Sequence, residues 1–265
     1  MNNVIKVTIW GESHQKYIGG TIENLAPGIH LELDFIKNQL SRRRGELDLS
    51  TPRKEKDDFE IVSGYYNGYT TGEPLTIIIK NKDVDSSFYE KNRYVMRPSH
   101  ADYTSFVKSF GFNDNRGGGH HSGRISAVLV ALGSIALQIL FSKGINIFTH
   151  IYKIKGISDI SLLNYIGDLN ELCFKLLDKS FPVIDEEVEA KMKDLIIKTK
   201  EEKDSLGAIL ETCIFNLNPG FGGAYFESLE ASISKSIFSI PSIKGVEFGL
   251  GFDFVNFKGS QVNDE

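Results

Sequence analysis

Apolar residues fall in short runs typical of β-strands, separated by stretches with helical spacing. The strand-like runs cover residues 4–10, 59–63, 75–80, 145–151, 209–217 and 246–257. Helical patterns cover residues 33–40, 125–141 and 226–237, and Asp185 is placed to cap a further helix. Because strands and helices do not alternate regularly, the pattern favours an α+β sandwich, with helices packed between β-sheets, over a doubly wound parallel sheet.

The most apolar segment is residues 125–141, which is interrupted only by Ser126, Gly133, Ser134 and Gln138. A membrane-spanning helix needs about 20 predominantly apolar residues. A helix that is apolar on all sides is equally typical of the centre of a large soluble fold. We therefore predict a fully buried helix in a soluble protein.

Composition narrows the class of protein. Of the 265 residues, 41% are hydrophobic and 25% are charged, which is ordinary globular usage and argues against a disordered or fibrous chain. Thirty Lys and Arg against 35 Asp and Glu give a net charge of −5, which excludes a generally basic protein that coats nucleic acid. Two cysteines, Cys173 and Cys213, are too few for a disulfide scaffold or a Cys-based zinc module. The first residues lack a secretory signal pattern, so we expect a cytoplasmic protein with no nucleic-acid or membrane partner.

The first candidate site follows the first predicted strand and reads Gly11-Glu12-Ser13-His14. A Gly-x-Ser after a strand is similar to the nucleophile elbow of hydrolases, Gly-x-Ser-x-Gly, in which Ser13 would be the nucleophile. Gln15 stands where the second glycine of that motif belongs, and no earlier strands could form the sheet beneath it. His14 is either part of a site or a loop histidine without a special role.

The second candidate site is Arg97-Pro98-Ser99-His100-Ala101-Asp102-Tyr103. A histidine close to a cation and a carboxylate can titrate near neutrality, which suits proton transfer. The alternative is that Asp102 caps a following helix and His100 lies on the surface.

The third candidate site is Arg116-Gly117-Gly118-Gly119-His120-His121-Ser122-Gly123-Arg124, which leads into the apolar helix. Glycine-rich backbone at a helix N-terminus predicts an anion site, for phosphate above all. The spacing from Gly118 to Gly123 nearly matches a P-loop, but Arg124 and Ile125 replace its Lys and Ser/Thr, which disfavours ATP hydrolysis. Flavin phosphate remains compatible, whereas the adjacent histidines lack the spacing of a metal site, and we expect no metal.

A basic segment supports an anionic ligand. Arg42-Arg43-Arg44 ends a helical pattern, and Arg53, Lys54 and Lys56 follow it in an otherwise acidic chain. Cations at a helix C-terminus often only oppose the helix dipole. Three successive arginines cannot all point the same way on a helix, so at least one could reach a cleft and bind carboxylate or phosphate.

Taken together, these motifs resemble those of the chorismate synthase family, in order and approximate spacing. The resemblance includes two later segments, residues 240–247 and 259–265, and covers essentially the whole chain. It implies an α+β sandwich and a lyase of the shikimate pathway, the route of aromatic amino acid biosynthesis. Such enzymes form chorismate by 1,4-anti elimination of phosphate from 5-enolpyruvylshikimate 3-phosphate, and they require reduced FMN. It also implies a homotetramer, with NADPH as one candidate source of electrons for the flavin.

The resemblance also implies residue roles. His14 matches a histidine assigned to acid chemistry near the departing phosphate, and His100 one thought to protonate the reduced flavin. The substrate's phosphate and carboxylates would be held by Arg43, Arg44, Arg97 and Arg124. FMN would be contacted by His120, His121, Ser122, Pro241 and Ser242.

The chain departs from the family pattern at several positions. His120, His121 and Ile125 stand where Arg, Ser and Glu are usual, and Asp48 lies near the place of a further arginine. We also expect the family to continue past Glu265, so we interpret residues 1–265 as a single chorismate synthase-like domain that is truncated at its C-terminus. The alternative function is a catalytically impaired relative that binds phosphate ligands or partners without turnover.

Overall fold

The structure is a computed structural model that describes residues 4–44, 49, 55–82, 85–177 and 179–263. Asp48, Arg53 and Lys54 lie outside the described residues. The chain divides into two compact units, Met1–Asn216 and Leu217–Glu265, and each is described by itself. The interpretation of residues 1–265 as one domain stays a prediction.

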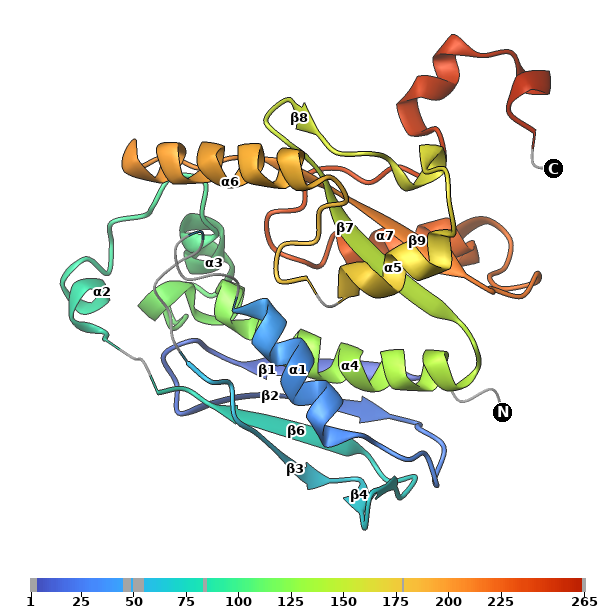
Figure 1. Ribbon diagram of the computed structural model, residues 1–265. Coiled ribbons are helices and arrows are strands. Elements are labelled where there is room, and N and C mark those ends of the chain that lie inside the picture. The colour runs from blue at the N-terminus through green and yellow to red at the C-terminus, as the bar shows by residue number, and fades with distance from the viewer. Residues whose placement is uncertain (1–3, 45–48, 50–54, 83–84, 178, 264–265) are drawn as a thin grey trace. The chain divides into compact units, whose positions relative to one another are not determined.

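The first unit contains a four-stranded antiparallel sheet in the order β1-β2-β6-β3 (Figure 1). Its strands are β1 (Lys6–Gly11), β2 (Tyr17–Glu23), β3 (Phe59–Ser63) and β6 (Leu75–Lys80). In β6, Leu75, Ile77 and Ile79 are buried, as the two-residue period of a strand with one covered face requires. A small hairpin of β4 (Tyr65–Tyr66) and β5 (Tyr69–Thr70) follows β3.

Two helices, α1 (Leu33–Arg43) and α4 (Ser126–Ser142), form a common hydrophobic core with this sheet. Gly20 of β2 makes this packing close, because a Cβ there would lie 2.7 Å from both Val128 and Leu132 of α4. By contrast, a Cβ at Gly133 would meet nothing within 4 Å. The close approach of α4 to β2 at this point therefore depends on the missing side chain of Gly20.

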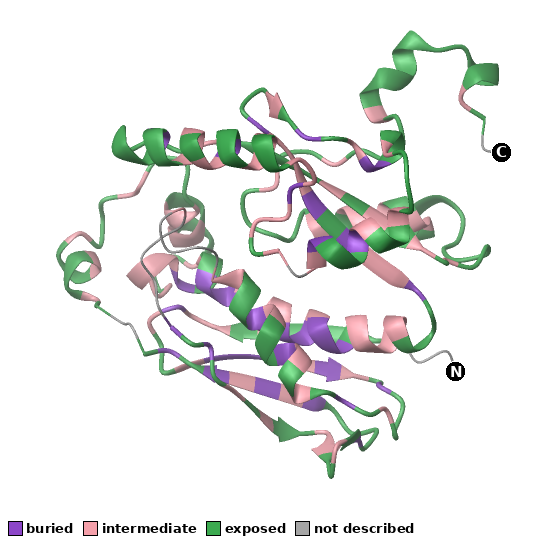
Figure 2. Ribbon diagram, in the orientation of Figure 1, coloured by how far each residue is buried: buried purple, intermediate pink, exposed green. Residues whose placement is uncertain are grey.

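Helix α4 is less enclosed than the sequence predicts. Six of its residues are buried: Ala127, Val128, Ala131, Leu132, Ser134 and Ile135. Ala136 is exposed, and several other positions are half-buried (Figure 2). Within the described residues, the prediction of a fully buried helix is therefore wrong. The segment Gly123–Ser142 is long and apolar enough to cross a membrane, by length and composition only. The packing of its buried side against β2 fits a core helix equally well.

The second sheet of this unit has the order β8-β7-β9. Its strands are β7 (Asn146–Ile154), β8 (Ile157–Ser158) and β9 (Ala208–Phe215), and helices α5 (Leu169–Leu177) and α6 (Glu186–Glu201) pack against them. Asp185 caps α6, as predicted, because its carboxylate accepts the backbone N–H groups of Glu187 and Val188. In Figure 1, α1 and α4 lie between the two sheets, as predicted for an α+β sandwich.

A buried histidine joins β7 to its neighbours. His150 is fully buried, with Nε2 2.8 Å from Glu211 Oε2 and Nδ1 3.3 Å from Asp159 Oδ2. Burial raises the pKa of Glu211, but hydrogen bonds from His150, the Leu162 amide and Ser161 together outweigh it and lower the pKa. Removing His150 would leave two enclosed carboxylates without their shared donor.

The second unit contains η4 (Tyr225–Glu227), α7 (Leu229–Ile237), η5 (Gly251–Asn256) and η6 (Gly259–Gln261). Helix α7 confirms the helical pattern predicted there, and Ser228 caps it by accepting the Ala231 amide. The strand predicted for residues 246–257 is wrong, because this segment forms a turn and η5. Gly249 and Gly251 have φ values of +58° and +53°, which an extended strand does not contain.

Candidate active site

His14 lies in the turn between β1 and β2. Its Nδ1 is 3.0 Å from the Ser13 hydroxyl, and its Nε2 is 3.2 Å from the carbonyl oxygen of Asp85. Ser13 is completely buried, and its hydroxyl also lies 3.1 Å from Arg116 O and 3.2 Å from Gly117 O. These contacts fix the plane of the imidazole. They also disfavour the hydrolase interpretation, because a nucleophile elbow needs an accessible hydroxyl.

The predicted anion loop packs directly against this histidine. In η1 (Arg116–His121), Gly117, Gly118 and Gly119 all have positive φ, at 57°, 85° and 56°. A Cβ at Gly117 would collide with the His14 ring, and one at Gly119 would collide with Asp114 O. Successive amides in such conformations form concave main-chain surfaces that bind anions. The glycines are therefore needed both for the backbone shape and for contact with His14.

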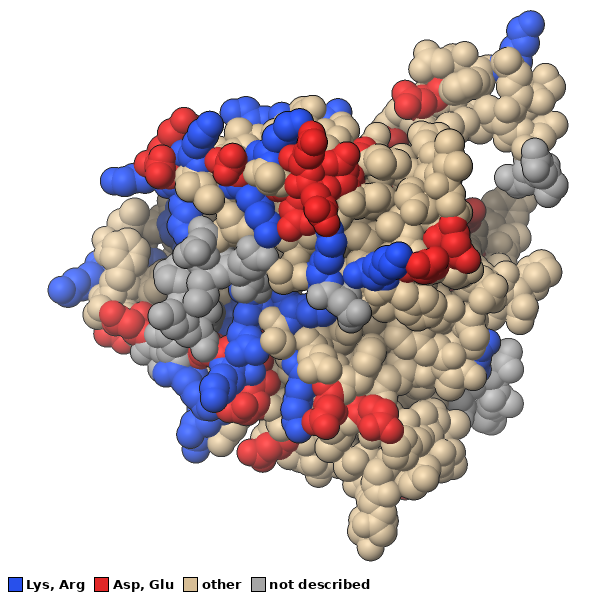
Figure 3. Space-filling view, viewed as in Figure 1, with Lys and Arg blue, Asp and Glu red and all other residues tan. Residues whose placement is uncertain are grey.

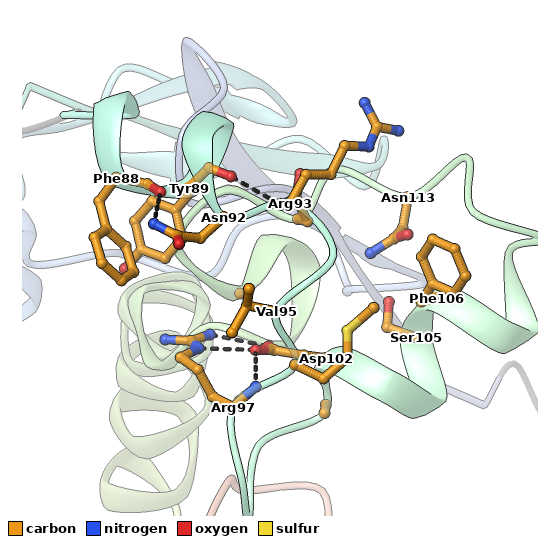
Figure 4. Close-up of a pocket in the computed structure, with 14 residues that line it drawn as sticks. Phe88, Tyr89, Asn92, Arg93, Val95, Arg97, Asp102, Ser105, Phe106 and Asn113 are labelled. Atoms are coloured by element: carbon orange, nitrogen blue, oxygen red, sulfur yellow. Dashed lines mark hydrogen bonds and ion pairs between the residues drawn. The ribbon is translucent and has the colours of Figure 1, made fainter.

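Tyr89 connects His14 to the second predicted motif. Its ring packs edge-on to His14 at 5.3 Å between centroids, and the Arg97 guanidinium lies 5.6 Å from the same ring. Tyr89 belongs to α2 (Ser87–Lys91), and Arg97 precedes α3 (Asp102–Lys108). Together with Gly118, these elements line a cavity of about 60 Å³ (Figure 4). The cavity has room for a small ion or for waters.

Arg97 is oriented by Asp102. The guanidinium donates from Nε to Oδ2 at 2.8 Å and from Nη2 to Oδ1 at 2.9 Å, as Figure 4 shows. These bonds lower the pKa of Asp102 and raise that of Arg97. A helix cap by Asp102 was the alternative role considered for this residue. The structure instead starts α3 at Asp102, gives Ala101 the cap position, and directs the carboxylate to Arg97.

His100 lies on the exposed turn beside this ion pair. Its Nδ1 is 2.9 Å from the Pro98 carbonyl oxygen, so that nitrogen carries a proton when it donates there. The preceding Ser99 has a φ of +62°, which turns the chain back towards α3. The structure places His100 next to Arg97 in the chain, where its ring contacts the Pro98 carbonyl rather than His14 or Arg124. Its role stays a prediction.

Arg43 and Arg124 lie in a buried polar cluster at the beginning of α4. Arg124, in η2 (Gly123–Ile125), has no exposed side-chain surface and donates to Asp57, to Glu55 at 3.1 Å and to Asn81 at 2.9 Å. Arg43, the last residue of α1, donates to Asp57 at 3.2 Å. The two guanidiniums thus share Asp57, and the carboxylates of Asp57 and Glu55 together balance their charge inside the fold.

Asn81 links this cluster to the turn that holds His14. Its Oδ1 accepts from Arg124, and its Nδ2 donates to the carbonyls of Glu12 at 3.2 Å and Gln15 at 2.7 Å. The first, second and third motifs are therefore joined by direct contacts. The structure brings His14 next to the glycine loop and Arg97, and it brings Arg124 within one side chain of the His14 turn.

The remaining predicted residues have different surroundings. His120 is exposed, with Nδ1 2.8 Å from Gly11 O, and exposed His121 packs edge-on to it. Ser122 caps η2 by accepting the Arg124 amide. Arg44 is half-buried and caps α1. Pro241 and Ser242 belong to the second unit, where both are exposed. The ligand-binding roles of these residues stay predictions.

Lys and Arg side chains gather in the middle of the face shown in Figure 3, near the C-terminal end of α1. Asp and Glu side chains lie around them on the same face. Among the described residues, no group of three or more His, Cys, Asp or Glu side chains could hold a metal ion.

Comparison with known proteins identifies the family. The family profile for chorismate synthase matches residues 5–265. The chain belongs to the chorismate synthase family. The chorismate synthase of Pyrococcus abyssi is 42% identical over 263 residues, covering 98% of this chain and 71% of the relative. That of Thermococcus kodakarensis is 40% identical over 262 residues, with the same coverage.

A solved structure supports the fold. A crystal structure of a chorismate synthase aligns with a TM-score of 0.79 at 28% identity, covering 99% of this chain and 73% of that one. The predicted α+β chorismate synthase fold is therefore confirmed. The family is one of soluble biosynthetic lyases of the shikimate pathway that use reduced flavin, and the relatives favour an enzyme over a non-catalytic binding protein.

Sequence reasoning missed Asp57, Asn81 and Tyr89. Asp57 and Asn81 flank the predicted strands at residues 59–63 and 75–80, where polar residues are ordinary turn formers. Their position at strand ends was the only available signal, and their partners are 14 to 69 residues away in the chain.

Proposed function

We propose that this chain catalyses the 1,4-anti elimination of phosphate from 5-enolpyruvylshikimate 3-phosphate to give chorismate, as a carbon–oxygen lyase acting on phosphates. The observation that carries the proposal is the packing of His14 against the three-glycine loop, with Arg97 next to both. A proton donor, a concave main-chain surface and a guanidinium then lie around one position. That arrangement suits a departing phosphate, whose charge they would stabilise.

The residues of this loop fit an anionic flavin cofactor. The positive φ values of Gly117, Gly118 and Gly119 form a cradle that side chains would fill, and Ser122, His120 and His121 add a hydroxyl and two imidazoles. We propose that these three residues hold FMN. When bound, reduced FMN would supply an electron transiently to the substrate. Pro241 and Ser242 are proposed as further FMN contacts, and NADPH as a candidate reductant.

The chain's own residues have distinct roles in this proposal. His14 holds a proton, and its plane is fixed by Ser13 on one side and the Asp85 carbonyl on the other. Arg97, oriented by Asp102, binds an anionic group of the substrate. His100, on an exposed turn, donates a proton towards the cofactor. Arg43, Arg44 and Arg124 contribute positive charge at the beginning of α4.

The proposal extends to the cellular context that fits such an enzyme. We propose a cytoplasmic location, a small-molecule substrate, and assembly as a homotetramer, without nucleic-acid, membrane or metal partners. Size-exclusion chromatography with light scattering would test the assembly, and a mass other than four chains would contradict it.

The direct test is an anaerobic incubation of the protein with reduced FMN and 5-enolpyruvylshikimate 3-phosphate, with released phosphate and chorismate absorbance as readouts. Wild-type protein should release phosphate and chorismate in equal amounts. His14→Ala should lower kcat about 10²- to 10⁴-fold, the usual contribution of a general acid. His30→Ala is the matched control, because His30 packs against Tyr69 and pairs with Glu32, away from the glycine loop. A folded, flavin-bound preparation that releases no phosphate would refute the proposal.

A further inference from the structure

Asp57 is a buried carboxylate that takes no part in the chemical steps of the proposed reaction. Only 1% of its side chain is exposed, and its φ of +54° is a left-handed conformation that few residues other than Gly, Asn and Asp tolerate. Its two oxygens accept from different arginines, Oδ1 from Arg124 and Oδ2 from Arg43. Such a bridge is informative, because two guanidiniums repel each other unless an anion lies between them.

Both arginines are also tied to the main chain where α4 begins. Arg43 donates from Nη2 to Gly123 O at 3.0 Å and from Nε to Ser126 Oγ at 3.1 Å. Arg124 itself belongs to the short helix that precedes α4, and its Nε donates to Asn81. Asp57 therefore joins the end of α1 to the beginning of α4 and, through Asn81, to the turn that carries His14.

We propose that Asp57 is a positioning residue, which is anchored by the enclosed Arg124 and holds the partly exposed Arg43 in the orientation required for binding the anionic substrate. The inference rests on the proposed function for its substrate. Without the carboxylate, the repulsion between the two guanidiniums is less well offset, and the direct bonds from Arg43 to Gly123 and Ser126 weaken. Glu55 contacts Arg124 from a second side and also accepts the Lys82 amide.

A different role for the same carboxylate predicts the opposite change in substrate affinity when Asp57 is neutralised. If Asp57 only competed with the substrate for the arginines, its neutralisation would strengthen the binding of an anion. If it positions them, its neutralisation weakens binding. The direction of the change in affinity therefore distinguishes positioning from competition.

Asp58 supplies a matched control on the same segment. Its carboxylate is 65% exposed and pairs with Lys82 Nζ at 2.7 Å. Asp58→Asn removes the same charge from the neighbouring position without touching either arginine. Asp57→Glu and Asp58→Glu form a second pair that keeps the charge and changes the reach of the carboxylate by one methylene.

The experiment measures the equilibrium affinity of each variant for 5-enolpyruvylshikimate 3-phosphate by calorimetry, with circular dichroism to confirm folding. We expect Asp57→Asn to weaken binding at least ~10-fold, the order of loss seen when a residue that orients a ligand-binding group is removed, and Asp58→Asn to change it less than ~2-fold. Asp57→Glu should recover part of the affinity, as a structural defect alone would not. Hydrogen exchange of the amides of residues 123–126 should quicken in Asp57→Asn and not in Asp58→Asn.

The possible results distinguish a failure of the Asp57 inference from a failure of the proposed reaction. Equal or tighter binding by Asp57→Asn than by Asp58→Asn would overturn it. If Asp57→Asn does not fold, Asp57→Glu decides, and affinity equal to that of Asp58→Glu would overturn the inference. A wild-type protein that binds the substrate but releases no phosphate refutes the proposed reaction alone, because the affinity comparison still stands. A wild-type protein that does not bind the substrate would overturn both.

Discussion

The contact between Gly117 and His14 can be tested by adding one methyl group. Gly117→Ala places a Cβ in the space that the imidazole occupies, 2.7 Å from the Ser13 hydroxyl. It also puts an L-residue at a φ of +57°. Both effects act on the same few atoms, so the substitution disturbs the His14 position more than any other part of the fold.

The expected size of the effect follows from these two terms. A left-handed φ costs an Ala residue about 1–2 kcal/mol, which should appear as lost stability. Carbon atoms pack at about 3.5–4.0 Å, so the ring has to move by roughly 1 Å or more to accept the methyl group. A displacement of about 1 Å in an active site can cost roughly 100-fold in rate. We therefore expect kcat to fall about 100-fold, equivalent to about 2.7 kcal/mol in activation free energy.

The assay is anaerobic phosphate release at saturating substrate, with urea unfolding measured on the same preparations. Gly123→Ala is the matched control, because a Cβ there would meet no heavy atom within 4 Å and Gly123 lies outside the left-handed region. It should keep kcat within a factor of about two. If Gly117→Ala turns over as fast as Gly123→Ala, then either the imidazole does not pack there or His14 does not act in the reaction.

Five further substitutions probe the site and the fold. His100→Ala should lower kcat by about 10²-fold or more with little change in KM, since a proton donor acts mainly in the transition state. In urea unfolding, Gly20→Ala should cost about 1–3 kcal/mol by overpacking the contact between β2 and α4, whereas Gly133→Ala, with open space around it, should gain about 0.5–1 kcal/mol. Asp102→Asn should lower stability at neutral pH and flatten the acid limb of a pH–stability curve. The lowered pKa of Asp102 gives stability above the unfolded-state value of about 3.9, and that stability is lost as pH falls through the folded-state pKa. His150→Ala should cost about 1–3 kcal/mol, because Asp159 and Glu211 lose the imidazole between them but keep their bonds to backbone amides.

Each of these has a result that contradicts it. A raised KM with unchanged kcat would show that His100 binds substrate and does not move a proton. Equal stability changes for Gly20→Ala and Gly133→Ala would mean that β2 and α4 are not in close contact. Identical acid limbs for wild type and Asp102→Asn would show that the Arg97 ion pair contributes nothing. If His150→Ala loses no more stability than exposed Thr149→Ala, the contacts of His150 with Asp159 and Glu211 do not stabilise the fold.

The elements best predicted from sequence are those in which local pattern and tertiary packing agree. The strands at residues 59–63 and 75–80 were predicted with the boundaries of β3 and β6, because short apolar runs rich in β-branched residues are typical of strands. Strand β2 was not predicted, since Gly19 and Gly20 interrupt its apolar pattern. Only the folded chain shows why they are there: a Cβ at Gly19 would collide with Trp10, and one at Gly20 with α4.

The site was predictable to the extent that its residues are consecutive. Gly11-Glu12-Ser13-His14 and the glycine loop indicated ligand chemistry separately, and glycine tolerance of positive φ explains why the second forms a cradle. Their contact, between residues more than 100 positions apart, could not be derived from either motif. In the sequence, Asp57 and Asn81 look like ordinary turn-forming residues. Their role is visible only in the folded chain, where the strands beside them bring their partners together.

The side-chain amide of Asn81 limits how segments can be exchanged between members of this enzyme family. Since one side chain bridges Arg124 and the backbone on either side of His14, the two segments cannot be exchanged independently between homologues. A chimaera that transplants either segment should therefore take residue 81 from the same homologue.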